Sequence, residues 1–202
     1  MNLKAYRERR DFTETPEPSG LTSKGELKFC IQMHDARRLH YDFRLEVDGV
    51  LKSWAVPKGP SLNPSNKRLA IQVEDHPMDY RTFEGTIPEG NYGAGEVIVW
   101  DEGTYTAYGA TTRRESEQMM RQMLDKGHVH IILQGEKLKG DWSLVRLPGG
   151  ASDQWLLIKG KDEYVSTEEV RLQSYSVRSE RELNPHLDEG KKKPRKHAQP
   201  SD

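Results

Sequence analysis

An unbroken alternation of side-chain character between Leu39 and Leu45 constrains this chain most. Polar and apolar side chains take turns there: His40, Asp42 and Arg44 alternate with Leu39, Tyr41, Phe43 and Leu45. Because a β-strand sends successive side chains to opposite faces, the run predicts a strand with one apolar face for a core. Its other face carries an imidazole, a carboxylate and a guanidinium in a row, which are groups that bind metal ions and phosphates.

Short strand-like runs continue along most of the chain, and turn residues separate them. The runs cover residues 27–34, 38–47, 51–56, 68–74, 96–100, 103–108, 128–134, 137–147 and 154–159. Asp48-Gly49 is typical of a hairpin turn, and runs 96–100 and 103–108 are expected to form another hairpin. One amphipathic helix is predicted over 114–126, with Gly127 as its stop. Many short strands with one helix favour a β-barrel or sandwich over a parallel α/β sheet.

The composition suits one modest domain with polar ends. Of the 202 residues, 34% are hydrophobic, and the mean hydropathy is −0.89. We expect a loosely held N-terminal arm over 1–26, a barrel domain over 27–178 and a charged tail over 179–202. The lysine-rich run 191–196 is interpreted as a solvated tail, with an electrostatic tether to nucleic acid as the alternative.

Several functional classes are excluded or disfavoured by what the sequence contains. Cys30 is the single cysteine, so an internal disulfide is excluded, and its place in an alternating run indicates a buried strand residue rather than a nucleophile. No apolar run approaches membrane-spanning length and no signal peptide is recognised, so we expect a soluble, cytoplasmic protein. The net charge of −1 means that any nucleic-acid contact must come from a local basic patch.

A metal site is one interpretation of the polar strand face. His40 and Asp42 can share an ion, and His34, just before the turn, can supply a third ligand while leaving positions open for water and substrate. Such nitrogen and oxygen donors suit Mn²⁺, Zn²⁺ or Fe²⁺. The alternatives are hydrogen-bonded strand histidines with Asp42 paired to Arg44, or an iron oxygenase that uses His40, Asp42 and a distant histidine.

An arginine beside this metal pattern points to an anionic substrate. Arg44 alone would repel a cation, but a phosphate that bridges the two removes that conflict, and a guanidinium binds phosphate in a bidentate manner. Lys58, Arg68 and His76 could complete a ring around a phosphate. Taken alone, Lys58 and Arg68 would be interpreted as solvated charges and His76 as a structural histidine. The alternating pair His128 and His130 lacks an acidic residue at matching spacing, so we interpret both as structural.

Three ordered motifs resemble the 3′-phosphoesterase domain of bacterial ligase D, the multidomain DNA ligase of non-homologous end joining, and its free-standing relatives. The motifs are HDARRLHYDFRLE, LKSWAVPKGPS and RLAIQVEDHPMDYRTFEGTIPEGNYGAGEVIVWDEGTY. The likeness covers about residues 6 to 178. It implies a mainly β fold, a small closed barrel of about eight strands with one or two short helices and flexible termini.

The resemblance also implies a set of site residues. The metal ligands would be His34, His40 and Asp42, with Mn²⁺ as the cofactor and other divalent transition metals as alternatives. Catalytic or phosphate-contacting roles are implied for Arg44, Lys58, Arg68, His76 and Tyr80, with a supporting role for Glu74. In the N-terminal arm, Arg10 and Asp11 match a substrate-binding pair of the family.

The implied activity is the healing of DNA or RNA/DNA primer-template 3′ ends. Members remove a 3′-terminal ribonucleoside and then convert the resulting 3′-phosphate to a hydroxyl. Because the sequence contains no ligase or polymerase domain, we expect the protein to act alone or with a separate ligase, polymerase or end-binding repair protein. We also expect a monomer. The alternative function is a non-catalytic DNA-end binding module.

Overall fold

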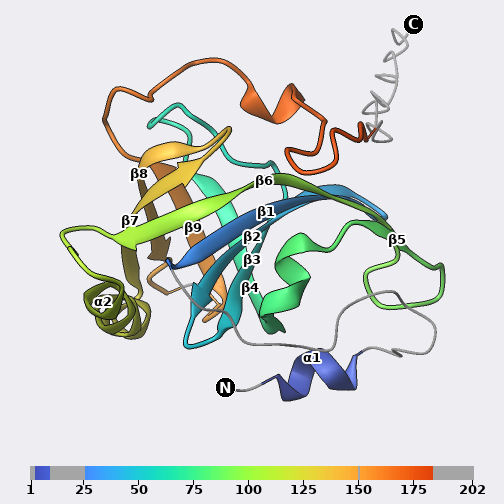
Figure 1. The fold of residues 1–202 in the computed structure, drawn as a ribbon, viewed down its shortest axis with the longest axis horizontal. Helices are drawn as coiled ribbons and strands as arrows, with labels where there is room; N and C mark the ends of the chain where they lie inside the picture. The colour runs from blue at the N-terminus through green and yellow to red at the C-terminus, as the bar shows by residue number, and fades with distance from the viewer. Residues whose placement is uncertain (1–2, 10–25, 150, 184–202) are drawn as a thin grey trace, which may run out of the picture.

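Antiparallel pairing of successive strands dominates the computed structural model, which describes residues 3–9, 26–149 and 151–183 (Figure 1). The strands are β1 (Lys28–Asp35), β2 (Leu39–Val47), β3 (Val50–Val56), β4 (Arg68–Pro77), β5 (Gly85–Ile87), β6 (Gly95–Ala107), β7 (His128–Gly135), β8 (Lys139–Arg146) and β9 (Gln154–Lys159). The helices are α1 (Lys4–Glu8) and α2 (Arg113–Lys126), with 3₁₀ turns η1 (Met78–Thr82) and η2 (Val170–Leu172).

Pairing between β1 and β6 closes the sheet into a barrel. Within the described residues the strand order is β1-β2-β3-β4-β9-β8-β7-β6, and β6 then pairs back with β1, so eight strands form the ring. The short β5 pairs only with the first part of β6 and lies outside this ring. The mainly β fold with a small closed barrel, expected from the resemblance, is confirmed.

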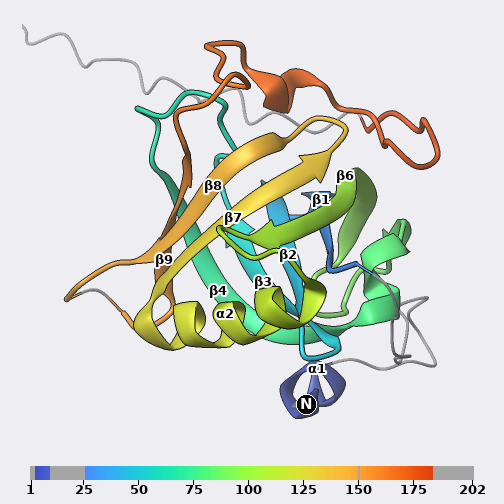
Figure 2. The same ribbon diagram turned by 60° about the vertical axis from the view of Figure 1, so that its left-hand side comes forward.

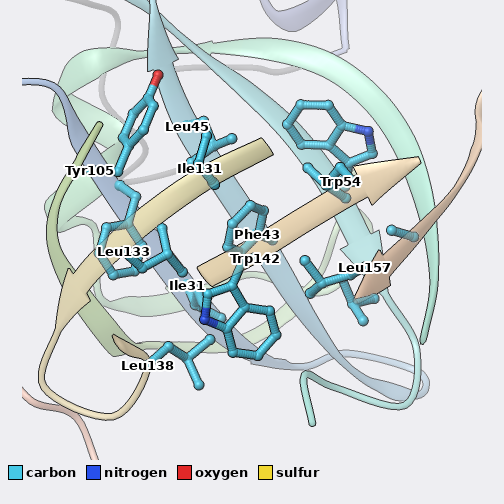
Figure 3. Packing of buried hydrophobic residues seen from close by; sticks show 14 of the residues in the cluster. Ile31, Phe43, Leu45, Trp54, Tyr105, Ile131, Leu133, Leu138, Trp142 and Leu157 are labelled. Atoms are coloured by element: carbon cyan, nitrogen blue, oxygen red, sulfur yellow. The ribbon is translucent and has the colours of Figure 1, made fainter. Parts of the chain in front are cut away.

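The barrel interior is filled by large side chains. All four tryptophans are buried, and Trp54 and Trp142 lie among Phe43, Leu157 and other apolar residues in the centre (Figure 3). Helix α2 closes one end of the barrel by packing Met120 into this cluster (Figure 2). Because side chains fill the interior, a substrate site has to lie on the outer face of the sheet.

A second apolar cluster lies on the outer face of the strands. It joins Tyr6 of α1 to Leu51, Met78, Tyr80, Phe83, Ile87 and Val97. The η1 turn and α1 thus cover part of the outside of β1, β3 and β4 instead of leaving it to solvent. This cover forms one wall of the site described below.

The predicted hairpin over 96–100 and 103–108 is wrong. Both runs belong to one long strand, β6, whose first part pairs with β1 and β5 and whose last part pairs with β7. Gly103 lies so close to the carbonyl oxygen of Gln134 that a Cβ atom would clash. Asp101 accepts the backbone N–H groups of Glu136, Lys137 and Leu138 and so ties β6 to the β7–β8 turn. Residues 101–103 therefore form no turn. They allow β6 to run closely between β1 and β7.

The helix predicted over 114–126 is confirmed as α2, which begins one residue earlier. Thr112 caps it, with a reciprocal capping box to Glu115 that satisfies the first free N–H groups. Gly127 ends it in the left-handed region, with φ of 74°.

The two ends of the chain pack more closely than their polar composition indicates. Tyr6 in the arm is fully buried, and Leu183, beyond residue 178, is buried in the barrel cluster. Arg10, Asp11 and the lysine-rich run 191–196 lie outside the described residues. None of the described helices is long and apolar enough to cross a membrane.

Replacement of Gly103 by alanine tests the close passage of β6 past β7. We expect Gly103→Ala to lower the free energy of unfolding by about 1–3 kcal/mol, because the added methyl group must push the strands apart. Thr106→Ala, at an exposed position of the same strand, is the control and should change it by less than about 1 kcal/mol. Chemical denaturation of both variants measures the difference, and equal stabilities would contradict the close contact.

Candidate metal centre and phosphate cleft

The register between β1 and β2 assembles the polar face. His34 lies opposite His40, Gln32 lies opposite Asp42, and Cys30 lies opposite Arg44. Residues directly opposite each other in an antiparallel pair share a face of the sheet. The two histidines of the motif, separated by a turn in the sequence, are thereby brought to ring centroids 4.7 Å apart.

Backbone carbonyls fix the orientation of both histidines. His34 Nε2 lies 2.8 Å from the carbonyl oxygen of Gly93, and His40 Nδ1 lies 2.9 Å from that of Arg38. Because a carbonyl only accepts, these nitrogens carry the protons of the neutral rings. The lone pairs of His34 Nδ1 and His40 Nε2 then face Asp42, at 3.6 Å from Oδ2 and 3.7 Å from Oδ1.

These three side chains fit a divalent cation. Their ligand atoms lie within 4.8 Å of one another. A neutral imidazole lone pair and a carboxylate oxygen do not hydrogen-bond to each other. The distances of 3.6 Å and 3.7 Å from the two histidine nitrogens to Asp42 are nevertheless close to the roughly 3–3.5 Å between neighbouring ligands of one ion. Carbonyl groups that hold the outer ring nitrogen are also the usual support of metal-binding histidines. Two imidazoles and one carboxylate suit Mn²⁺, Zn²⁺ or Fe²⁺.

Asp42 is the buried anion of this centre. Burial raises the pKa of its carboxyl, but the adjacent Arg44 guanidinium opposes burial, and the pKa lies well below its usual range. The carboxylate is therefore charged at neutral pH, as a metal ligand must be.

Arg44 is held beside the centre by three hydrogen bonds. It donates from Nη2 to Asp42 at 3.1 Å, from Nε to Gln32 at 2.7 Å and from Nη1 to Ser53 at 2.9 Å. Its guanidinium also lies 4.8 Å above the ring of Tyr80. A guanidinium has five N–H groups, and these contacts use three of them. One N–H remains on each terminal nitrogen, and such a pair can bind a phosphate.

His76 occupies the neighbouring wall of the same cleft. Its Nδ1 lies 2.9 Å from the backbone carbonyl of Glu74, which assigns the proton of the neutral ring to that nitrogen. The ring packs between Tyr6 and Tyr80, with centroids 5.0 Å and 4.8 Å away. This packing presents Nε2 as the nitrogen that can exchange a proton with a ligand.

A cleft of about 270 Å³ joins these groups. Its lining includes predicted residues, namely His34, His40, Asp42, Arg44, Glu74, His76 and Tyr80, and also Ala36, Ala55, Val73, Ile87, Tyr92 and Gly93. Arg9 of the N-terminal arm lies at this cleft, donating to Glu74 at 2.7 Å and to the Tyr92 hydroxyl at 3.4 Å. The arrangement can hold a metal ion and a phosphate side by side.

Lys58 and Arg68 are not brought to this cleft. Lys58 is exposed in the turn after β3. Arg68 shares its face of β4 with the core residue Ala70, whereas Val73, which lines the cleft, is on the opposite face. Their functional roles therefore stay predictions.

Sequence reasoning missed four side chains that hold or cover the centre. Gln32 and Ser53 fix Arg44, and Tyr6 and Arg9 come from an arm that we expected to be loosely held. Gln32 carried a usable signal, because it alternates with His34 on β1. Tyr6 and Arg9 carried none, because they contact residues of β4 that lie far away in the sequence.

Two of the residues interpreted as structural, Cys30 and His130, do not line the cleft. Cys30 is fully buried, and burial raises the pKa of its thiol to about 12, which excludes a reactive thiolate. His130 contacts Asp141 at 2.8 Å and stacks on Tyr108, away from the cleft.

Comparison with known proteins gives consistent matches. The family model of the DNA ligase D 3′-phosphoesterase domain matches residues 32–146. The multifunctional non-homologous end joining protein LigD of Pseudomonas aeruginosa is 52% identical over 192 residues, covering 91% of this chain and 22% of that protein. The corresponding DNA repair protein LigD of Mycobacterium tuberculosis is 46% identical over 165 residues, covering 80% of this chain and 20% of that protein. The chain thus spans about a fifth of the length of these curated relatives.

Removal of one imidazole tests the metal centre. We expect His40→Ala to weaken Mn²⁺ binding by more than about 100-fold, because it removes one of three ligands. His130→Ala is the matched control and should leave Mn²⁺ affinity unchanged. Electron paramagnetic resonance of free Mn²⁺ measures both, and equal affinities in the two variants would contradict the ligand assignment.

Proposed function

The chain belongs to the DNA ligase D 3′-phosphoesterase domain family, and on that premise we propose that it is a metal-dependent enzyme that heals nucleic-acid 3′ ends. It would remove a 3′-terminal ribonucleoside from a primer strand and then remove the remaining 3′-phosphate. The observation that carries this proposal is the convergence of His34, His40 and Asp42 beside the Arg44 guanidinium in one cleft.

Both steps are hydrolyses at phosphorus. In the first, water adds to the phosphodiester and the 5′-oxygen of the terminal ribonucleoside leaves, which gives a strand with a 3′-phosphate. In the second, water adds to that phosphate and the 3′-oxygen leaves, which gives a 3′-hydroxyl and inorganic phosphate. One site can serve both reactions, because the same phosphoryl group is attacked each time.

Mn²⁺ is the proposed cofactor, held by His34 Nδ1, His40 Nε2 and a carboxylate oxygen of Asp42. When bound, the ion would supply Lewis-acid polarisation of a phosphate oxygen and acidification of a water molecule. Other divalent transition metals suit the same donors.

The protein's own groups supply the rest of the chemistry. Arg44 would bind non-bridging phosphate oxygens with its two remaining N–H groups and stabilise the charge that grows in the transition state. His76 would exchange a proton through Nε2, either with a phosphate oxygen or with the leaving oxygen. Tyr80 holds the guanidinium plane in place by packing against it.

The proposed substrate and repair process are inferred from the relatives. Their names assign them to non-homologous end joining, so we propose DNA or RNA/DNA 3′ ends at strand breaks as the substrate. Sealing of the healed end would then require a ligase activity, and synthesis from it a polymerase activity. Arg10 and Asp11 are proposed to contribute from the arm, and Lys58 and Arg68 to contact the strand outside the cleft.

The first test is Mn²⁺-dependent processing of a labelled primer-template that ends in one 3′ ribonucleotide, beside a primer that ends in a 3′-phosphate. We expect stepwise conversion to a 3′-hydroxyl, and a loss of at least about 100-fold in rate for Asp42→Ala. Asp75→Ala is the control, since Asp75 pairs with Lys52 and does not line the cleft. Tight binding of both primers without product would instead favour the end-binding module.

A charge-conserving replacement separates guanidinium geometry from positive charge. We expect Arg44→Lys to lower kcat by about 100-fold, because an ammonium group cannot keep the contacts to Gln32 and Ser53 while it binds a phosphate with a fork of donors. Mn²⁺ affinity should change far less than kcat. Wild-type kcat in this variant would exclude the proposed role of Arg44.

A further inference from the structure

Exposure rises steadily along the polar face of β2. The side chain of Arg44 is 3% exposed, that of Asp42 is 11% and that of His40 is 25%. Beyond them, Arg37 and Arg38 in the turn between β1 and β2 are exposed. The cleft is therefore closed at the Arg44 end, where α1 and η1 cover it, and it opens toward this turn.

Four exposed cations lie at this open end. Arg37 and Arg38 lie in the turn after β1, whose last residue, Asp35, pairs with Glu96 at the start of β6 (Figure 1). Lys58 follows Val56, which pairs with Tyr41 near the start of β2, and Lys67 directly precedes β4. We call Arg37, Arg38, Lys58 and Lys67 the basic rim.

The basic rim is not neutralised within the part of the chain that the structure describes. No ion pair with a described residue involves any of its four side chains. At the opposite end of β2, in contrast, Asp48 pairs with Arg121 of α2. Exposed cations that pair with no described residue, at the strand ends on the open side of the candidate cleft, are suited to bind further phosphates.

We propose that the basic rim binds the backbone phosphates of the strand that leads to the 3′ end held in the cleft. Arg37 and Arg38 are the central contacts, because they lie in the turn next to His40, where the cleft opens. The inference rests on the proposed function and extends it to the course of the substrate strand. It supplies the local basic patch that a chain of net charge −1 needs for nucleic acid.

The two arginine side chains can be removed without removing the support of the metal centre. The contact from Arg38 to His40 uses the backbone carbonyl of Arg38, which an alanine retains. The double variant Arg37→Ala/Arg38→Ala therefore tests strand binding, and its Mn²⁺ affinity shows whether the centre remains intact.

The experiment compares a 3′-phosphate primer-template with a 3′-phosphate dinucleotide, which is too short to reach beyond the turn. We expect the double variant to lower the preference in kcat/KM for the primer-template over the dinucleotide by at least about tenfold. The slope of log affinity against log salt for the primer-template should also fall by about 2, as two phosphate contacts are lost.

A matched control removes two positive charges elsewhere. Arg114→Ala/Lys126→Ala changes two exposed residues of α2, at the far end of the barrel, and should retain the wild-type preference and salt slope. Wild-type behaviour of the Arg37→Ala/Arg38→Ala variant, or an equal loss in the α2 variant, would overturn the proposal.

Failure of the proposed function would give a different pattern. In that case the wild-type protein hydrolyses neither substrate with Mn²⁺. Fluorescence anisotropy of the labelled primer-template then still tests the basic rim: weaker binding by the double variant than by the α2 variant supports it, and equal binding refutes it.

Discussion

The site depends on the charge of one buried carboxylate. Asp42 lies beside Arg44, and the guanidinium keeps it ionised although burial disfavours the charged form. Two buried charges of opposite sign are stable only if their remaining donors and acceptors are satisfied. Gln32 and Ser53 meet that need on Arg44, and the amide of Gln32 in turn donates to the carbonyls of Tyr80 and Phe83. The same network that balances the charge thus attaches η1 to the barrel.

Strand register explains why two histidines from different strands lie together in the candidate metal centre. A shift of one residue between β1 and β2 would send His34 to the barrel interior, where Met33 and Ile31 now lie. Register is fixed by the apolar residues on the interior face, so the core determines the geometry of the metal centre. The Gly93 carbonyl completes it from the segment between β5 and β6, a backbone position with φ of 79° that few residues other than glycine adopt.

The sequence predicted the parts of the molecule that follow local rules. The alternation of β2, the α2 helix and the series of short strands depend on side-chain periodicity and turn residues, and they were confirmed. Closure of the strands into one ring was expected only from the family resemblance. The predicted hairpin at Asp101-Glu102-Gly103 was wrong, because the residues are typical of a turn but have other roles. Gly103 lets β6 pass close to β7, and Asp101 accepts hydrogen bonds from the β7–β8 turn. Tyr6 and Arg9 could not be predicted, since a short helix in a polar arm acquires its position only from tertiary contacts with β4 and η1.

A filled barrel also accounts for the composition of the cleft walls. Four tryptophans and many aliphatic residues fill the barrel interior, and the candidate site lies on the outer face of β1 to β4. An outer face is exposed to water unless other segments cover it, and α1, η1 and the segment that carries Tyr92 provide that cover on three sides. Among the described residues, the side without cover is the β1–β2 turn. The proposed substrate strand would enter there, where the exposed side chains are cations rather than the apolar groups that close the other sides.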